Sequence, residues 1–176
     1  HGHIHFGENK IQEAEIKWVE LKKKFNHLKL HMLGNLQSNK AKKAVQLFDY
    51  IHSLDSKKLA LKISQYENEL NKKTKIFISV NLGDEIQKSG ISIKELESFY
   101  SYCSNDLSLN IIGLMCLPPL GSDPQKYFNT LKDSAHSLNL KELSMGMSSD
   151  FEKALLSNST FLRLGTIIMG ERPSSI

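Results

Sequence analysis

The stretch "LSMGMSSDFEKAL" (residues 143–155) has the form of a buried strand, a tight turn and the start of a helix. An apolar run leads into Gly146, small hydroxyl residues follow it, and an amphipathic segment comes next. Small residues at such a junction have two explanations. They simply turn the chain and cap the helix, with Ser149 as the cap, or they let the backbone approach a phosphate closely. This stretch alone leaves both explanations open.

The same unit recurs along the whole chain. Segments with the apolar period of a helix, such as the face formed by Ile11, Ala14, Trp18, Leu21 and Phe25, separate short apolar runs. These runs predict strands at 3–6, 28–33, 50–54, 75–82, 110–117, 142–145 and 161–168. Helix starts are predicted by the capping-box pairs Ser92–Glu95 and Ser149–Glu152 and by Asp123 before Pro124. Strict alternation of strand and helix predicts parallel strands joined by crossover helices.

Two architectures fit this alternation, an open doubly wound sheet and a (β/α)₈ barrel. The seven predicted units are one short of a barrel, the chain begins on a strand, and its 176 residues fall below the roughly 200 usual for such barrels. We therefore expect an α/β (β/α)₈ TIM-type barrel with its first βα unit missing, forming a single domain over residues 1–176. The strands at 3–6 and 161–168 should then present unpaired edges beside an open or filled gap.

The composition is that of a globular protein, with 40% hydrophobic and 24% charged residues and a net charge of +4. No apolar run approaches the length of a membrane span, and Cys103 and Cys116 lack metal or redox spacing, so we expect a cytoplasmic protein with buried thiols and no membrane contact. The "HGHIH" start favours an edge strand over a metal site. The basic runs at 22–24 and 39–43 favour a solvated helix face over nucleic-acid binding.

Counted as a barrel, the chain places its candidate site in the loops after strands seven and eight, where such barrels commonly hold a phosphate. Gly146 and Gly165 would let the backbone approach, and hydroxyls are offered by Ser144, Ser148 and Thr166. Arg163 lies between two leucines and so points to the opposite face of its strand. A guanidinium inside a barrel needs a partner, which is either a core carboxylate or a ligand.

Seven blocks occur in order at consistent spacing: "FGENKIQEA" (6–14), "LGNLQSNKAK" (33–42), "IHSLD" (51–55), "VNLGDEIQKSGI" (80–91), "GLMCLP" (113–118), "LSMGMSSD" (143–150) and "LRLGTIIMGER" (162–172). Together they resemble the pyridoxal phosphate homeostasis protein family, whose barrels are similar to the N-terminal domain of alanine racemase. The resemblance implies a barrel with pyridoxal 5′-phosphate (PLP) at its C-terminal mouth.

Carried onto this sequence, the resemblance implies that Ser144, Gly165 and Thr166 bind the phosphate, that Arg163 faces the pyridine nitrogen, and that Asn9 and Met145 lie near the ring. A permanent cation at that nitrogen disfavours its protonation and makes the ring a poor electron sink. This suits a carrier of the cofactor better than an enzyme that transforms amino acids.

One feature departs from the family pattern. Family members hold the aldehyde as a Schiff base on a lysine in the segment before "FGEN", whereas only five residues precede Phe6 here and none is lysine. The Schiff-base lysine is thus absent from this chain, and Lys88 could offer only a substitute amine. We expect the chain to bind the phosphate at most weakly and to form no ordinary internal aldimine.

The favoured function is intracellular PLP homeostasis, meaning buffering and delivery of the cofactor without a reaction of its own. The expected partners are PLP and PLP-dependent apo-enzymes, and the full-length form is expected to be a monomer. The first alternative is a racemase-like or decarboxylase-like PLP enzyme on the same barrel. The second is a nucleic-acid-binding protein, which predicts a steep salt dependence of binding.

Overall fold

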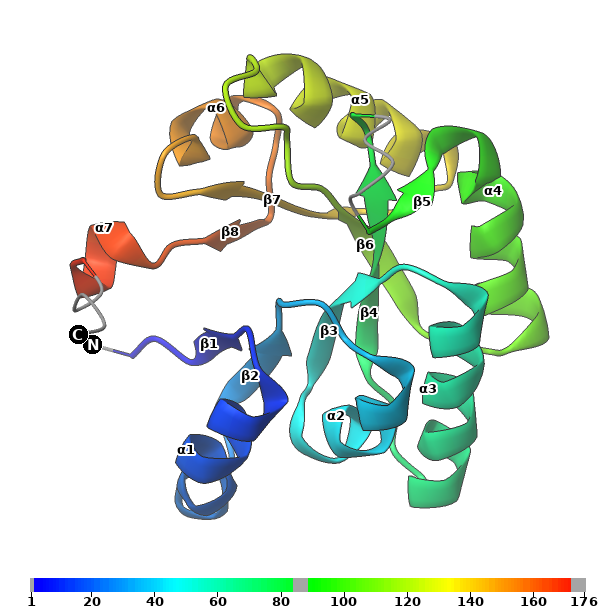
Figure 1. Cartoon of the computed structure of the whole chain (residues 1–176), viewed down its shortest axis with the longest axis vertical. Coiled ribbons are helices and arrows are strands. Elements are labelled where there is room, and N and C mark those ends of the chain that lie inside the picture. The colour runs from blue at the N-terminus through cyan, green and yellow to red at the C-terminus, as the bar shows by residue number, and fades with distance from the viewer. Residues whose placement is uncertain (1, 84–88, 172–176) are drawn as a thin grey trace.

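The computed structural model describes residues 2–83 and 89–171, in which strands and helices alternate from end to end (Figure 1). The strands are β1 (His5–Glu8), β2 (Lys29–Met32), β3 (Tyr50–Leu54), β4 (Lys75–Asn81), β5 (Ile91–Ser92), β6 (Ile111–Met115), β7 (Glu142–Met147) and β8 (Phe161–Arg163). The α-helices are α1 (Ile11–Lys24), α2 (Ala41–Leu47), α3 (Lys57–Leu70), α4 (Ile93–Ser101), α5 (Pro124–Ser137), α6 (Phe151–Leu156) and α7 (Thr166–Met169). Two single-turn helices, η1 (Ser38–Lys40) and η2 (Tyr102–Asp106), extend α2 and α4.

The strands form one curved parallel sheet in the order β1-β2-β3-β4-β6-β7-β8, and the two-residue β5 pairs with the end of β4. β1 and β8 are the two ends of this order, and they face each other across the opening of the barrel in Figure 1. The rings of His5 and Phe161 lie 6.2 Å apart across that opening. The expected architecture is thereby confirmed as a nearly closed barrel of parallel strands with β1 and β8 at its edges.

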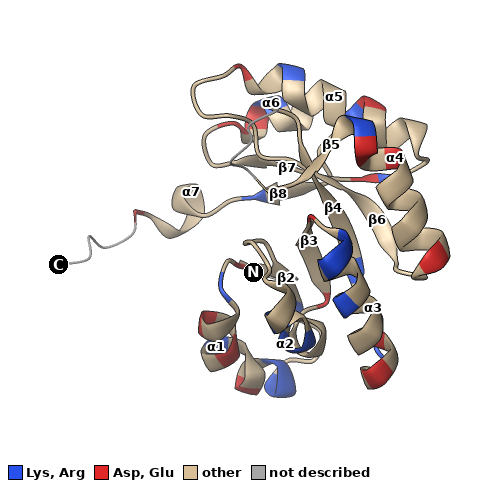
Figure 2. Cartoon of the chain, turned by 45° about the vertical axis from the view of Figure 1, so that its right-hand side comes forward, with Lys and Arg blue, Asp and Glu red and all other residues tan. Residues whose placement is uncertain are grey.

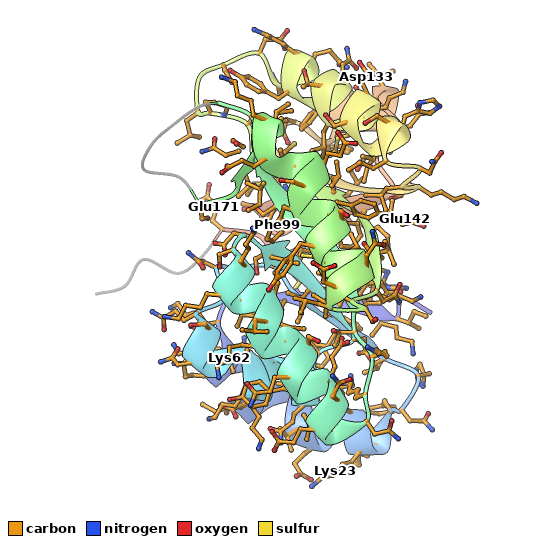
Figure 3. The ribbon with its side chains drawn as sticks, turned by 90° about the vertical axis from the view of Figure 1, so that its right-hand side faces the viewer. Lys23, Lys62, Phe99, Asp133, Glu142 and Glu171 are labelled. Carbon is orange, nitrogen blue, oxygen red and sulfur yellow. The ribbon has the colours of Figure 1, made fainter. Side chains whose placement is uncertain are left out.

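Alternation along the strands creates two apolar layers. The outer layer fills the space between strands and helices, and includes Ile51, Ile78 and Leu114 from the strands and Phe99 from α4. Figure 3 shows α3, α4 and α5 side by side on the outside of the sheet, where they cover this outer layer; Lys62 is labelled on α3 and Asp133 on α5. The inner layer lies inside the barrel and is mainly aromatic: Tyr50, Phe77, Met115, Ile112 and Phe161.

The charged residues lie mainly on the helices and loops, with both signs interspersed (Figure 2). The two basic runs noted in the sequence are part of this pattern. Lys23 Nζ lies 2.7 Å from Glu20 Oε1 and Lys43 Nζ lies 2.9 Å from Glu15 Oε2. Lys42 pairs with Glu69. Within the described residues, no helix has the length and apolar character needed to cross a bilayer.

Three predicted element ends can be compared with the structure. Asp123 caps α5 as expected, because its carboxylate accepts from the amide of Gln125 at 3.3 Å, with Pro124 in the first turn. Ser92 precedes α4, but its hydroxyl donates to the Glu95 carboxylate at 2.6 Å and makes no bond to the helix backbone. The prediction for Ser149 is wrong, since α6 begins at Phe151 with Asp150 in the cap position.

The strand predicted over 161–168 is also too long. β8 ends at Arg163, and α7 begins at Thr166. Gly165 adopts φ −114° and ψ −82°, which leaves the extended conformation, and its carbonyl then accepts from the amides of Ile168 and Met169 at 3.0 and 2.8 Å. The β-branched residues of this segment favour a strand, but the turn at Gly165 overrides that preference.

Candidate functional site

The C-terminal ends of β7 and β8 form one rim of the barrel mouth. The turn after β7 needs Gly146, whose φ is +93° and whose position leaves no room for a side chain, because an added Cβ would lie 2.6 Å from the Cβ of Ala154. The turn is then fixed by Asp150, whose carboxylate accepts from the amide of Met147 at 2.6 Å. This turn presents Ser148 toward the segment that follows β8.

Ser148 connects the two loops. Its half-buried hydroxyl oxygen accepts from the amides of Gly165 and Ile167 at 3.3 and 3.4 Å. Gly165 and Thr166 are exposed, and a Cβ added to Gly165 would meet no atom within 4 Å. The arrangement therefore offers backbone donors, two hydroxyls and open space above Gly165, which is what an oxyanion requires of a binding surface.

Arg163 reaches into the barrel from the end of β8, as its place in the sequence predicts. One guanidinium nitrogen donates to Ser144 Oγ at 2.8 Å and another donates to the Cys116 carbonyl at 2.9 Å. Burial lowers the pKa of Arg163 from its ordinary value, while Cys116 and Asp150 oppose that shift. An arginine remains charged throughout the accessible pH range, so the site holds a fixed cation bound to two neutral groups.

Of the residues that the resemblance singled out, Ser144 and Met145 do not reach the open mouth. Ser144 is 0% exposed and lies inside the barrel with its oxygen bonded to Arg163 and His52. Met145 is also 0% exposed and points the other way, into the apolar layer between strands and helices. The structure thus brings Arg163, Gly165 and Thr166 to one rim, with Ser144 beneath them and Met145 behind.

Asn9 lies on the other side of the barrel opening. It follows β1, is exposed, and borders a cavity of about 470 Å³ whose lining also includes Lys10, Asn35, Gln37 and Lys40. The loop after β2 is packed tightly here, because a Cβ added to Gly34 would lie 2.1 Å from the Asn9 carbonyl oxygen. Lys88 lies outside the described residues.

Three histidines that the sequence placed in strands line the barrel interior. His31 and His52 are 4% and 1% exposed, so both rings are buried there. Burial, with an added effect of His5, lowers the pKa of His31 to about 3, and burial likewise lowers the pKa of His52 well below its ordinary value. No group of three or more histidine, cysteine or acidic side chains in the described ranges is placed to hold a metal ion.

The class of protein to which this barrel belongs follows from comparison with known proteins. The sequence profile of the family described as alanine racemase, N-terminal domain, matches residues 1–173, and the fold is that of the Clostridium difficile alanine racemase, at a TM-score of 0.73 and 13% identity over 97% of this chain and 46% of that one. The chain is thus a barrel of the alanine racemase N-terminal type.

Closer relatives define the family within that class. The pyridoxal phosphate homeostasis protein of Synechocystis sp. is 40% identical over 176 residues, covering 95% of this chain and 80% of the relative, and that of Aquifex aeolicus is 36% identical over 95% and 76%. The structure of PipY from Synechococcus elongatus with PLP bound has a TM-score of 0.88 and 38% identity over 96% of this chain and 82% of that one. The chain belongs to the pyridoxal phosphate homeostasis protein family.

Proposed function

We propose that this chain binds pyridoxal 5′-phosphate at the C-terminal mouth of its barrel, weakly and without an ordinary internal aldimine as its sequence leads us to expect, and that it serves PLP homeostasis by buffering and delivering the cofactor. Two findings support the proposal. Curated relatives at 40% and 36% identity carry the name pyridoxal phosphate homeostasis protein, and the PipY structure at 38% identity has PLP bound. When bound, PLP supplies an aldehyde and a conjugated pyridine ring for amine chemistry.

The single observation that carries the proposal is the open rim at Gly165. A phosphate needs donors that converge on a place free of side chains, and the amides of Gly165 and Ile167 already converge on the Ser148 hydroxyl oxygen. A phosphate oxygen that takes the place of the Ser148 hydroxyl as acceptor would receive both amides, the freed hydroxyl could donate to the phosphate, and Thr166 adds an exposed hydroxyl. We therefore propose Ser148, Gly165 and Thr166 as the phosphate-binding set.

The proposed contacts differ from the family-based expectation at two positions. The expectation that Ser144 holds the phosphate stays a prediction, and the burial of Ser144 favours Ser148 for that contact. Met145 could contribute near the ring only through its backbone, because its side chain is directed into the outer core. Arg163 stays proposed for the pyridine nitrogen and Asn9 for the ring, on opposite sides of the barrel opening.

Arg163 also favours a carrier over an enzyme. A fixed cation opposite the pyridine nitrogen would keep that nitrogen unprotonated and so weaken the ring as an electron sink. We propose that the protein catalyses no reaction of its own, that its full-length form is a monomer, and that it acts in the cytoplasm by passing PLP to PLP-dependent apo-enzymes. L-alanine incubated with the protein and PLP should then not racemise, while an apo-enzyme mixed with the loaded protein should regain activity.

Binding of pyridoxine 5′-phosphate tests the site itself, because this ligand has the ring and the phosphate but no aldehyde that could react with surface lysines. Gly165→Ala adds one methyl group in open space and should leave the fold unchanged, yet lower the affinity about tenfold or more by occupying the place of the phosphate. Ser148→Ala should weaken binding in the same sense. Ser134→Ala on α5, where the hydroxyl donates to the helix carbonyl of Thr130 at 2.9 Å, is the matched control.

The proposal would be overturned by a Gly165→Ala variant that binds pyridoxine 5′-phosphate as tightly as the wild type. Inorganic phosphate should compete with the ligand, whereas pyridoxine without its phosphate should bind far more weakly. Equal binding of the phosphorylated and unphosphorylated forms would also contradict a phosphate-binding site at this rim.

A further inference from the structure

Five side chains from five strands form an unbroken hydrogen-bonded line through the barrel interior. The line begins at half-buried His5, whose Nδ1 lies 2.8 Å from His31 Nε2. His31 Nδ1 lies 2.8 Å from His52 Nε2, and His52 Nδ1 lies 2.8 Å from Ser144 Oγ. Arg163 ends the line by donating to the same Ser144 oxygen at 2.8 Å. The three histidines take no part in the proposed phosphate contacts.

The chemistry of Arg163 fixes the direction in which each proton points. A guanidinium can only donate, so Ser144 Oγ accepts from Arg163. Within the described residues the other hydrogen-bond partner of this fully buried hydroxyl is His52 Nδ1. If Ser144 also accepted from His52, its own proton would be buried without a partner, which native structures avoid. Ser144 therefore donates to His52 Nδ1.

The same reasoning passes from ring to ring. A neutral imidazole has one donor and one acceptor, so His52 carries its proton on Nε2 and donates to His31 Nδ1. His31 in turn carries its proton on Nε2 and donates to His5 Nδ1. All three rings are then neutral Nε2–H tautomers, and the line runs one way from Arg163 to His5.

The surroundings keep the line neutral. Burial is the largest cause that lowers the pKa of all three histidines, and the charge of Arg163 adds to it at His52. Other charged or titratable groups act more weakly than burial. Asp49 raises the pKa of both His5 and His31, and His3 lowers both. Lys29 and Lys75 lower the pKa of His5, and His5 and Lys22 lower that of His31. His52 is also held in place by stacking on Phe77, with ring centroids 4.3 Å apart.

We propose that His52, supported by His31 and His5, is a positioning residue for Arg163. Because the line commits the Ser144 proton to His52, the lone pairs of Ser144 are left to accept from the guanidinium, which holds Arg163 in one orientation. The consequence for the cofactor rests on the proposed function, in which Arg163 faces the pyridine nitrogen. The positioning itself belongs to the unliganded chain and can be measured there.

Nuclear magnetic resonance of the unliganded chain tests the line directly. Long-range ¹H–¹⁵N correlation spectra show which ring nitrogen carries the proton, and His31 and His52 should both be neutral Nε2–H tautomers at pH 7. An Nδ1–H tautomer or an imidazolium at His52 would overturn the proposed direction.

The orientation of Arg163 gives a second readout that a merely structural histidine would not control. The Nη resonances of Arg163 should be resolved in the wild type, since rotation of the guanidinium is hindered, and averaged in His52→Phe, which keeps a ring against Phe77 but has no nitrogen. His52→Gln supplies both an acceptor and a donor and should restore the resolved resonances. Resolved resonances in His52→Phe, or averaged ones in the wild type, would overturn the positioning role.

Ligand binding separates this inference from the proposed function. The ultraviolet spectrum of bound pyridoxine 5′-phosphate reports protonation of its ring nitrogen, and His52→Phe should raise that nitrogen's pKa by about one unit, the equivalent of one lost hydrogen bond to a charged group. Affinity for inorganic phosphate should stay within about twofold. If the wild type binds no pyridoxine 5′-phosphate, the proposed function fails, and the tautomer and Arg163 measurements still decide the role of His52.

Discussion

Lowering the pH should destabilise the fold through the buried histidines, and His31 allows the size of the effect to be worked out. Its pKa is about 3 in the folded chain against an ordinary value of 6.5. Above 6.5 both folded and unfolded states are neutral at this residue. Below 6.5 the unfolded chain binds a proton that the folded chain rejects, so stability falls as the pH drops from 6.5 toward 3.

About pH 5 lies roughly 1.5 units below 6.5, and each unit costs about 1.4 kcal/mol, so His31 alone should lower the free energy of unfolding by about 2 kcal/mol. His52 adds to the loss in the same direction, since its pKa is lowered as well. Urea unfolding followed by circular dichroism at pH 7 and at about pH 5 measures the difference in the free energy of unfolding. The wild type should lose at least this amount.

His31→Gln removes the titrating ring while its amide can still accept from His52 and donate to His5. Its loss of stability between the two pH values should be smaller than that of the wild type by about 2 kcal/mol. His136→Gln, on the exposed face of α5, is the matched control and should behave as the wild type. Identical pH dependence in the wild type and in His31→Gln would refute the assignment of His31 as a neutral buried group.

Three further predictions concern packing, buried polar groups and thiol reactivity. Gly146→Ala should lower the free energy of unfolding by about 2–4 kcal/mol, because the added Cβ would sit at a positive φ and only 2.6 Å from Ala154. The control Gly121→Ala should cost only about 1 kcal/mol, because Gly121 has a positive φ but an added Cβ would meet no atom within 4 Å. Equal losses in the two variants would contradict the packing argument. Glu67→Ala should cost about 2–4 kcal/mol in urea unfolding, since the buried carboxylate accepts from the Thr74 amide at 2.7 Å. Glu67→Gln should keep most of that stability. The control Glu69→Ala, on the exposed side of α3, should cost under about 1 kcal/mol. A Glu67→Ala variant as stable as the wild type would show that the buried carboxylate does not stabilise the fold. Burial raises the pKa of both Cys103 and Cys116 to about 12, so neither thiol should react with a disulfide reagent at pH 8 until denaturant is added, and rapid labelling of the native chain would contradict their burial.

The barrel could be predicted from the sequence because its signals are local and repeated. The alternation of apolar runs with helical segments places the seven barrel strands close to where they lie, and Asp123 with Pro124 marks the start of α5 correctly. The end of β8 could not be predicted in this way. Thr166, Ile167 and Ile168 favour a strand by their side chains, and only the backbone turn at Gly165 makes them helical.

The candidate site could also be predicted only in part from the sequence, because some of its features follow from local patterns and others depend on long-range contacts. The inward direction of Arg163 follows from alternation along one strand, whereas the choice between Ser144 and Ser148 depends on β7 continuing to Met147, which leaves Ser144 inside the barrel and Ser148 at its rim. The line from His5 to Ser144 depends on the stagger between strands far apart in the sequence, which no local pattern encodes.

A crystal structure of the chain with pyridoxal 5′-phosphate tests the central claim most directly. The account predicts that the phosphate lies within hydrogen-bond distance of the Gly165 amide and the Ser148 hydroxyl, and that the pyridine nitrogen faces Arg163. A phosphate bound in the cavity beside Asn9, Lys10 and Lys40 instead, with the rim at Gly165 empty, would contradict it.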